Sequence, residues 1–230
     1  MNLESRTSYA ERFAENGVVI VEYLFSPGEL LALDAAFEAH PAGGAGARSA
    51  RLGQNFIASL RRNQTLQRLA DELSGTTASL VRVVAFDKTP ETNWFVPWHQ
   101  DRSIAVVEKA DCAGFANWTV KDGVAHTEPP VAVLESMVTL RLHLDACDEN
   151  NGPLEVVPGS HRLGRLDRQG TQRAVKEGQQ KLCLAARGDV LAMRPLLLHR
   201  SQRAKHPNAR RVLHLEYAAT SLPPSLAWAC

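Results

Sequence analysis

The chain has no cysteine pair, no long apolar run and almost no surplus charge, and each of these absences excludes a class of protein. Its 230 residues include four cysteines that are far apart and form no Cys-x-x-Cys motif, namely Cys112, Cys147, Cys183 and Cys230. This spacing is not that of a disulfide framework, so we expect a reducing compartment. No stretch reaches the length of a membrane span, and residues 1–13 carry charges where a signal peptide needs an apolar segment. We therefore expect a cytoplasmic protein without a membrane partner.

The charge balance also excludes a nucleic-acid-binding surface of the usual kind. Lysine and arginine number 26 against 25 aspartates and glutamates, which gives a formal charge of +1. A nucleic-acid or anionic-membrane partner normally requires a clear basic surplus. Hydrophobic residues at 44% and charged residues at 22% are typical of a globular protein with a substantial core. We expect a small-molecule substrate, and composition leaves the oligomeric state open.

Helix signals concentrate before about residue 79 and strand signals after it. Ser26 precedes Pro27 and stands three residues before Glu29, which is typical of a capped helix start. The pattern predicts a helix over residues 27–39. The other predicted elements are a strand over 17–21, a helix over 65–73, and strands over 80–86, 138–145, 154–157, 181–184, 190–193 and 211–217.

Short strands separated by turn residues favour a mostly β fold, either an antiparallel double sheet or a jelly roll, with N-terminal α-helices flanking it. We expect a single domain over residues 1–230, with a flanking region at 1–79 and a jelly-roll core at 80–220. Residues 111–130 are too irregular for a barrel strand. Their length predicts a lid or substrate loop.

Two of the strands alternate between apolar and polar residues, which places the two kinds on opposite faces. On residues 138–145 the polar face carries Thr139, Arg141, His143 and Asp145. On the last strand it carries Arg210, His214 and Glu216. The core of a simple sandwich is apolar, so polar inward faces covered by helices outside indicate a barrel lined for chemistry.

His99 and Asp101 are two residues apart, a spacing that on a strand turns both side chains to one face. With a second histidine from another strand, they would supply two imidazoles and one carboxylate to a metal ion. This set leaves coordination positions open and is used for iron(II) oxygen chemistry. His-x-Asp by itself is a weak motif.

Other residues compete for the same roles. The alternative metal pairs are His143 with Asp145 and His126 with Glu128. The candidates for the second histidine are His161, His199, His206 and His214. His199 follows the apolar run at 196–198, where a strand would hold a ligand rigidly. An isolated histidine in such a place is more often a packed core residue.

A dianionic co-substrate requires a cation within the site, and an arginine fork matches a carboxylate. Arg210 and Arg211 are the two candidates near the last strand. Arg210 shares the polar face with His214, whereas Arg211 shares the apolar face with Leu213. The strand register therefore selects Arg210.

These motifs together resemble the phytanoyl-CoA dioxygenase family of the iron(II)/2-oxoglutarate-dependent oxygenase superfamily. The resemblance extends over about residues 80–218 and rests on segments 86–90, 93–101, 151–161, 194–199 and 210–214. It implies a double-stranded β-helix, a cupin-like jelly-roll barrel. It also implies iron(II), 2-oxoglutarate and O2 as cofactor and co-substrates.

The resemblance assigns roles that spacing left open. The metal ligands that it implies are His99, Asp101 and His199, which form the catalytic centre. It implies that Arg210, about eleven residues after the distal histidine, binds 2-oxoglutarate, with help from Ser201, Thr139 and Arg141. The carboxylate of Asp101 argues against halogenation, because halogenating relatives carry a small residue there.

The implied reaction is hydroxylation of an unactivated C–H bond in a small metabolite, with O2 consumed and succinate and CO2 released. Phytanoyl-CoA itself is disfavoured, because the chain shows no peroxisomal ending. The residues expected to shape substrate choice are Lys88, Asn93, Trp94, Trp118 and His126. The competing hypotheses are a catalytically silent jelly-roll binding protein and another metal-dependent cupin-type enzyme.

Overall fold

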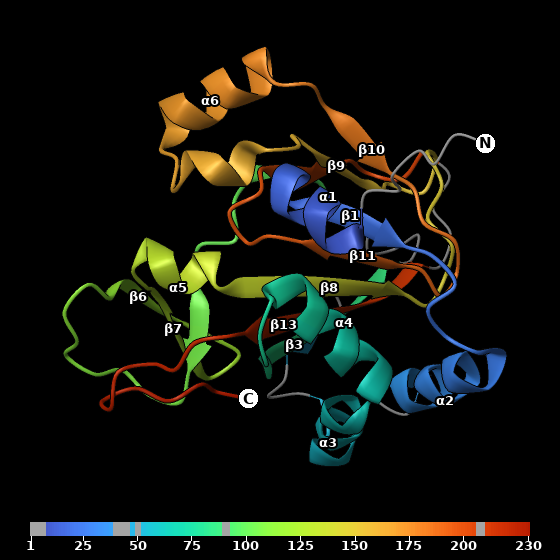
Figure 1. The fold of residues 1–230 in the computed structure, drawn as a ribbon, viewed down its shortest axis with the longest axis horizontal. Helices are drawn as coiled ribbons and strands as arrows, with labels where there is room; N and C mark the ends of the chain where they lie inside the picture. The colour runs from blue at the N-terminus through green and yellow to red at the C-terminus, as the bar shows by residue number, and fades with distance from the viewer. Residues whose placement is uncertain (1–7, 39–46, 49–51, 89–92, 206–209) are drawn as a thin grey trace.

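Two antiparallel sheets form the body of the protein in the computed structural model, which describes residues 8–38, 47–48, 52–88, 93–205 and 210–230 (Figure 1). The larger sheet has the strand order β1 (Val18–Val21), β11 (Val190–Met193), β8 (Met137–His143), β13 (Arg210–Ala218), β3 (Ser79–Lys88) and β2 (Ala47–Arg48). The smaller sheet has the order β10 (Lys181–Cys183), β9 (Leu154–Val156), β12 (His199–Ser201) and β4 (Val96–His99). This mostly β architecture confirms the predicted jelly-roll class.

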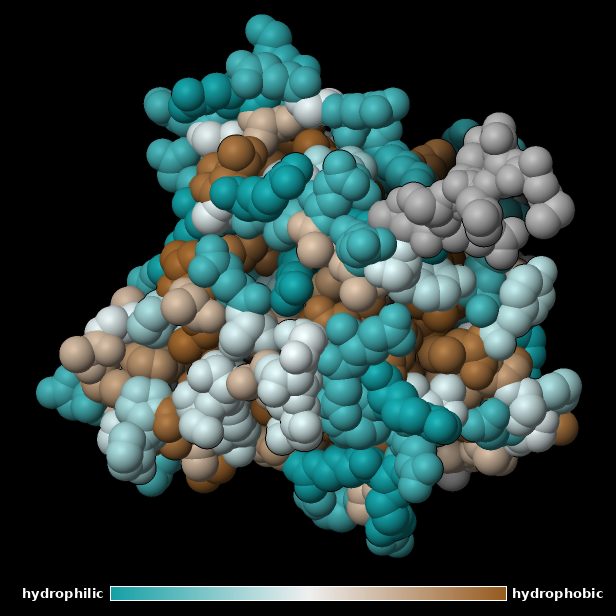
Figure 2. Space-filling model, viewed as in Figure 1, coloured by the Kyte–Doolittle hydropathy of each residue, from teal (hydrophilic) through white to brown (hydrophobic). Residues whose placement is uncertain are grey.

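Helices cover the outer face of the larger sheet. The covering helices are α1 (Tyr9–Asn16), α2 (Pro27–Glu38), α3 (Gln54–Arg62) and α4 (Gln64–Ser74). Further helical elements lie elsewhere, namely α5 (Val131–Glu135), the 3-10 helix η2 (Ser160–Leu163) and α6 (Arg168–Glu177), and hydrophilic residues cover most of the visible surface of α6 (Figure 2). The predicted start of α2 is confirmed, since the backbone N–H and the hydroxyl of Ser26 both donate to Glu29 Oε2, at 2.9 and 2.7 Å.

The main hydrophobic core lies between this sheet face and the N-terminal helices. Leu140 and Leu142 of β8 and Leu213 and Leu215 of β13 are fully buried there, against side chains of α1 to α4 such as Leu66. Each such leucine stabilises the fold by about 1.5–3 kcal/mol. The apolar side of the predicted alternation therefore faces the helices, and the polar side faces the space between the two sheets.

The prediction that residues 111–130 are irregular is wrong, whereas their role as a lid or substrate loop stays a prediction. Strands β6 (Ala116–Lys121) and β7 (Val124–Glu128) form a hairpin, which pairs with β5 (Ile104–Val106) in a third sheet. Strand β6 is largely exposed, so its sequence lacks the usual apolar alternation. The signal that reveals the hairpin is Asp122-Gly123, whose φ angles of 51° and 79° suit a tight turn between two strands.

None of the helices within the described residues has both the length and the apolar character needed to cross a membrane. The single domain over residues 1–230 and the cytoplasmic location stay predictions.

Candidate metal centre and basic pocket

The two candidate histidines meet because their strands are neighbours. His99 ends β4, His199 begins β12, and the two residues are direct antiparallel partners in the smaller sheet. Their ring centroids are 4.1 Å apart. Asp101 follows β4, where its backbone N–H donates to Pro195 O at 2.8 Å. One ligand atom from each of His99, Asp101 and His199 lies within 4.8 Å of the others.

Hydrogen bonds set which nitrogen of each ring is available to a metal. Nδ1 of His99 lies 2.9 Å from Pro97 O, and Nδ1 of His199 lies 2.9 Å from Leu197 O. A carbonyl oxygen only accepts, so each Nδ1 carries the proton and each Nε2 keeps its lone pair.

Both free Nε2 atoms turn toward the same carboxylate. They lie 3.8 Å from Asp101 Oδ1 for His99 and 3.7 Å from Asp101 Oδ2 for His199. Asp101 Oδ2 is buried and has no hydrogen-bond donor. Two lone pairs and an unsatisfied carboxylate oxygen around one point fit a divalent cation of the non-haem iron type.

Electrostatics favours the protonation states that a metal requires. Burial, with a smaller contribution from His99, lowers the pKa of His199 to about 4 despite the opposing effect of Asp101, so this imidazole is neutral at physiological pH. Burial by itself would raise the pKa of Asp101, but the surrounding histidines and Arg82 hold it below its usual value. The cluster is therefore ready to bind a cation near neutral pH.

Gln100, which sequence reasoning missed, lies between His99 and Asp101 and holds the backbone there in place. Its Nε2 donates to Gly164 O and to Leu196 O, each at 2.8 Å, and its Oε1 accepts from Leu166 N–H at 2.8 Å. All three of these hydrogen bonds of the Gln100 side chain are made with backbone groups. Only its position between His99 and Asp101 hints at this role in the sequence.

The cluster forms one wall of a pocket between the two sheets. The lining residues come from both sheets, namely Phe86, Trp94, Val96, His99, Asp101, Arg141, Leu154, His199, Ser201, Arg210 and His214. The empty space that these residues surround is about 490 Å³, part of which is open to solvent.

Arg210 and Ser201 lie together in this pocket and are both buried. The Ser201 hydroxyl donates to Gly152 O at 3.0 Å, and Arg210 Nη1 donates to the same carbonyl. Arg210 Nη1 also lies 3.5 Å from Cys147 Sγ, and its Nε is buried without a hydrogen-bond partner. A buried guanidinium with unused donors is a suitable partner for a carboxylate.

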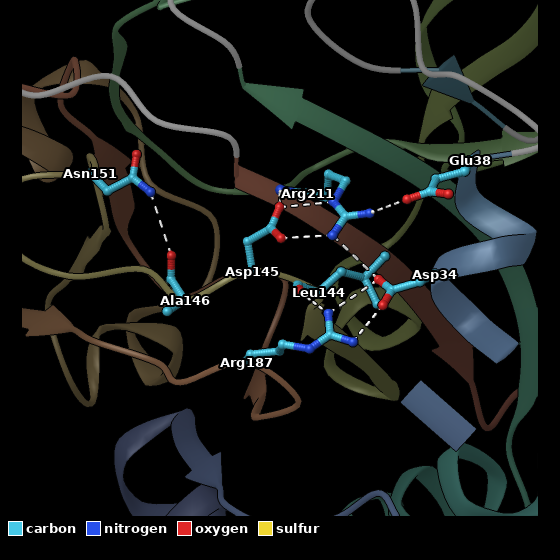
Figure 3. A network of polar contacts seen from close by, with 8 residues as sticks. All are labelled: Asp34, Glu38, Leu144, Asp145, Ala146, Asn151, Arg187 and Arg211. Atoms are coloured by element: carbon cyan, nitrogen blue, oxygen red, sulfur yellow. Dashed lines mark hydrogen bonds and ion pairs between the residues drawn. The ribbon is translucent and has the colours of Figure 1, made fainter. Parts of the chain in front are cut away.

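Arg211 lies on the opposite side of β13, as the register predicted. It donates to both oxygens of Asp145, at 2.9 Å from Nε and 2.7 Å from Nη2 (Figure 3). Asp34 and Glu38 of α2 lie 3.4 and 3.3 Å from its guanidinium. Arg211 thus connects the sheet to α2 and does not line the pocket.

The same ion-pair network involves Asp145, which belongs to the second His-x-Asp motif. The prediction that Asp145 shares the inward face of Arg141 is wrong, because β8 ends at His143 and the alternation ends with it. Asp145 instead binds Arg211. His143 is buried, and burial lowers its pKa to about 3. His143 and Asp145 therefore do not converge on one metal position.

A chain of buried polar contacts runs along the inner face of the larger sheet. Arg141 Nη1 lies 2.8 Å from His214 Nδ1, and His214 Nε2 lies 3.2 Å from Glu216 Oε1. Glu216 Oε1 also accepts from Arg82 Nη2 at 2.8 Å. A guanidinium only donates, so His214 Nδ1 accepts and its Nε2–H donates to the carboxylate. Burial lowers the pKa of His214, which keeps it neutral.

The remaining predicted site residues differ in whether they line this pocket. Thr139 is buried on β8 but does not line the pocket. Asn93 is not among the lining residues, and its side-chain amide donates to Ala204 O at 3.0 Å and accepts from Ala204 N–H at 2.8 Å. Trp94 lines the pocket. The side chain of Lys88, at the end of β3, lies outside the described part of the chain.

The hairpin residues are placed elsewhere as well. Trp118 of β6 packs, partly buried, against the hydrophobic cluster around Leu134, and His126 of β7 lines a separate cavity beside Arg82. Among the other histidines considered, His161 contacts Ala14 O of α1 at 3.2 Å, and His206 lies outside the described residues. The expectation that the hairpin encloses the metal pocket is not supported by the lining residues.

A jelly roll that brings two imidazoles and one carboxylate to a basic pocket has the architecture of a non-haem iron oxygenase. The family model for phytanoyl-CoA dioxygenase (PhyH) matches residues 13–212. The chain belongs to the phytanoyl-CoA dioxygenase family. The predicted class, an iron(II)- and 2-oxoglutarate-dependent oxygenase, is thereby confirmed.

Solved structures of similar shape support the fold. AviO1 from Streptomyces viridochromogenes Tue57 is 20% identical, with a TM-score of 0.68 over 98% of this chain and 100% of that one. EctD from S. alaskensis, solved with 2-oxoglutarate and 5-hydroxyectoine, is 20% identical, with a TM-score of 0.68 over 95% and 78%. The non-heme alpha ketoglutarate dependent carbocyclase SnoK from nogalamycin biosynthesis is 17% identical, with a TM-score of 0.69 over 94% and 84%. The search of curated proteins found no match.

Proposed function

We propose that the protein hydroxylates an unactivated C–H bond of a small metabolite, using iron(II), 2-oxoglutarate and O2. In this proposal His99, Asp101 and His199 hold the iron, and Arg210 with Ser201 binds the distal carboxylate of 2-oxoglutarate. The observation that carries it is the convergence of two Nε2 lone pairs and one buried carboxylate in the same pocket as Arg210.

The protein residues prepare the site before any ligand arrives. The Nδ1 hydrogen bonds of His99 and His199 orient both rings, and Gln100 secures the backbone beside Asp101. When bound, iron(II) supplies a Lewis-acidic centre for the keto acid and for oxygen activation. Arg210 lies with Ser201 in a buried part of the pocket, where a charge-assisted bond to carboxylate is strong.

Hydroxylation is the simplest outcome for a site that keeps Asp101 as a ligand. Proteins of this fold reach other outcomes too, since SnoK is described as a carbocyclase and SnoN, also from nogalamycin biosynthesis, as an epimerase. EctD was solved with the hydroxylated compound 5-hydroxyectoine. The carboxylate that the chain keeps at Asp101 supports hydroxylation, and the pocket between the two sheets supports a small-molecule substrate.

The proposal is tested by following succinate. Protein incubated with iron(II), ascorbate and 2-oxoglutarate should form succinate slowly, even without a primary substrate. His99→Ala and His199→Ala should abolish both turnover and iron binding, whereas His161→Ala should keep them. Full iron affinity in both ligand variants would contradict the assignment.

The competing hypotheses predict different results in the same assay. A silent binding protein would bind 2-oxoglutarate but release no succinate with any metabolite tested. A cupin-type hydrolase or isomerase would show no response to Arg210→Ala and would be active with zinc or manganese in place of iron.

A further inference from the structure

The pocket holds more positive charge than iron and 2-oxoglutarate require. Its described lining contains one carboxylate, on Asp101, and two buried guanidiniums, on Arg141 and Arg210. Loading with iron(II) adds two positive charges, and 2-oxoglutarate adds two negative ones. One positive charge then remains uncompensated inside the pocket, where a buried charge without a partner is unfavourable.

The uncompensated positive charge is that of the Arg141 guanidinium. Under the proposed function, one carboxylate of 2-oxoglutarate would bind Arg210 and the other would lie at the iron, so both anionic ends of the co-substrate have partners. Arg141, which the sequence resemblance made a helper in 2-oxoglutarate binding, is then not needed for the co-substrate. Within the described residues no carboxylate lies within ion-pair distance of Arg141, and its Nε is buried without a hydrogen-bond partner. Arg141 is 8% exposed and lines the pocket.

The surroundings of Arg141 hold its head group in one place. Nη1 donates to His214 Nδ1 at 2.8 Å, and the guanidinium carbon lies 5.3 Å from the centre of the Phe86 ring. His214 is in turn oriented by Glu216, which Arg82 neutralises. Because Glu216 is already paired, it does not cancel the charge of Arg141. The remaining donors of Arg141 are therefore preorganised for a ligand.

We propose that the primary substrate carries a carboxylate, which Arg141 binds inside the pocket while Arg210 holds 2-oxoglutarate. This inference rests on the proposed function and narrows its substrate class to small carboxylic acids. Glu216 is a positioning residue, since it acts on Arg141 through His214.

Matched acid and amide probes test the inference. The protein is loaded with iron(II) and 2-oxoglutarate without oxygen and titrated by calorimetry with benzoate or benzamide, and with propionate or propionamide. The wild type should bind each acid about 10- to 100-fold more tightly than its amide, because the acid gains a charge-assisted bond. Arg141→Gln should remove this preference, and Arg141→Lys should restore part of it.

Three controls separate a binding role from a structural one. Iron stoichiometry and 2-oxoglutarate affinity should change less than about threefold in Arg141→Gln and Arg141→Lys, since neither partner uses Arg141. If Arg141→Gln fails to fold, Arg141→Lys carries the comparison. Glu216→Gln should weaken acid binding severalfold and leave amide binding unchanged, a split that a general loss of stability would not produce.

The outcomes are distinguishable. Equal affinity for acid and amide, an acid preference that survives Arg141→Gln, or competition of the acids with 2-oxoglutarate would overturn the inference alone. A loss of 2-oxoglutarate affinity in Arg141→Gln would assign Arg141 to the co-substrate and also overturn it. A wild type that neither binds iron with 2-oxoglutarate nor forms succinate would overturn the proposed function together with the inference.

Discussion

Arg210 and Arg211 are adjacent in sequence, yet they belong to different parts of the protein. β13 turns Arg210 into the pocket and Arg211 toward Asp145 and α2. The pair therefore provides an internal control for the co-substrate site.

Arg210→Ala is expected to raise the KM for 2-oxoglutarate by about 10- to 100-fold, because a charge-assisted bond to the distal carboxylate is lost. Arg211→Ala should change this KM less than about twofold and should instead lower the free energy of unfolding. Steady-state succinate formation at varied 2-oxoglutarate measures the first effect, and urea unfolding measures the second. The opposite order of KM effects would show that the strand register does not define the co-substrate site.

The two His-x-Asp motifs provide a second matched comparison. Asp101→Ala should abolish stoichiometric iron binding, because the carboxylate between the two Nε2 atoms is removed. Asp145→Ala should keep one iron per chain and lose about 1 kcal/mol of stability with its bonds to Arg211. Anaerobic equilibrium dialysis measures the stoichiometry. Iron retained by Asp101→Ala and lost by Asp145→Ala would reverse the ligand assignment.

At the scale of elements, sequence patterns predicted the strands whose two faces differ in polarity. β8 and β13 separate leucines from polar residues, and β3, β9, β10 and β11 are short segments of strand-forming residues between turns, so each was predictable from the sequence. The exposed strand β6 gave no such contrast, and the 3-residue strand β5 was too short to show a period. α6 was also missed, because none of its residues is buried and it has no apolar stripe.

The candidate site was predictable to a similar extent. The sequence predicted His99, Asp101, His199 and Arg210 as site residues. Only the pairing of strands that are far apart in the chain shows that these residues lie together. Asn93 was expected to shape substrate choice, whereas its amide donates to and accepts from the backbone of Ala204. Contacts between residues more than a hundred positions apart leave no local pattern in one sequence.

The contact between α1 and the segment after β9 predicts a specific steric effect. Gly17, which caps α1, has φ +70°, and an added Cβ would lie 2.3 Å from His161 Nδ1. Gly75, which caps α4, has φ +71° and open space around it. Gly75→Ala should therefore cost about 1 kcal/mol for backbone strain, and Gly17→Ala should cost about 2–4 kcal/mol.

Urea unfolding measures both glycine variants. Replacing His161 by alanine in the Gly17→Ala background should recover most of the difference between the two. Equal losses in the two single variants would contradict a tight contact between α1 and His161.

For the whole molecule, buried neutral histidines predict how stability depends on pH. The pKa of His143 is near 6.5 in an unfolded chain and is lowered to about 3 in the fold by burial and by Arg141 and Arg210. Between these values the unfolded chain binds a proton that the folded protein does not. The stabilisation is therefore complete above about pH 6.5 and is lost progressively as the pH falls toward 3.

Metal-free protein should accordingly lose stability between pH 7.5 and pH 5 in urea unfolding. His143→Asn should reduce that loss by about 2 kcal/mol. This value corresponds to one proton that only the unfolded chain binds over the ~1.5 pH units below its pKa. The other buried histidines act in the same direction, so the remaining slope should stay positive. An identical pH dependence in wild type and His143→Asn would contradict the buried neutral state of this side chain.

The central claim is that one jelly-roll pocket binds iron(II) and 2-oxoglutarate through His99, Asp101, His199 and Arg210. A crystal structure of the protein prepared without oxygen, with iron(II) and 2-oxoglutarate, tests it most directly. We expect the metal on Nε2 of both histidines and on the Asp101 carboxylate, with the distal carboxylate of 2-oxoglutarate on Arg210. A metal held by other residues, or 2-oxoglutarate bound away from Arg210, would contradict the claim.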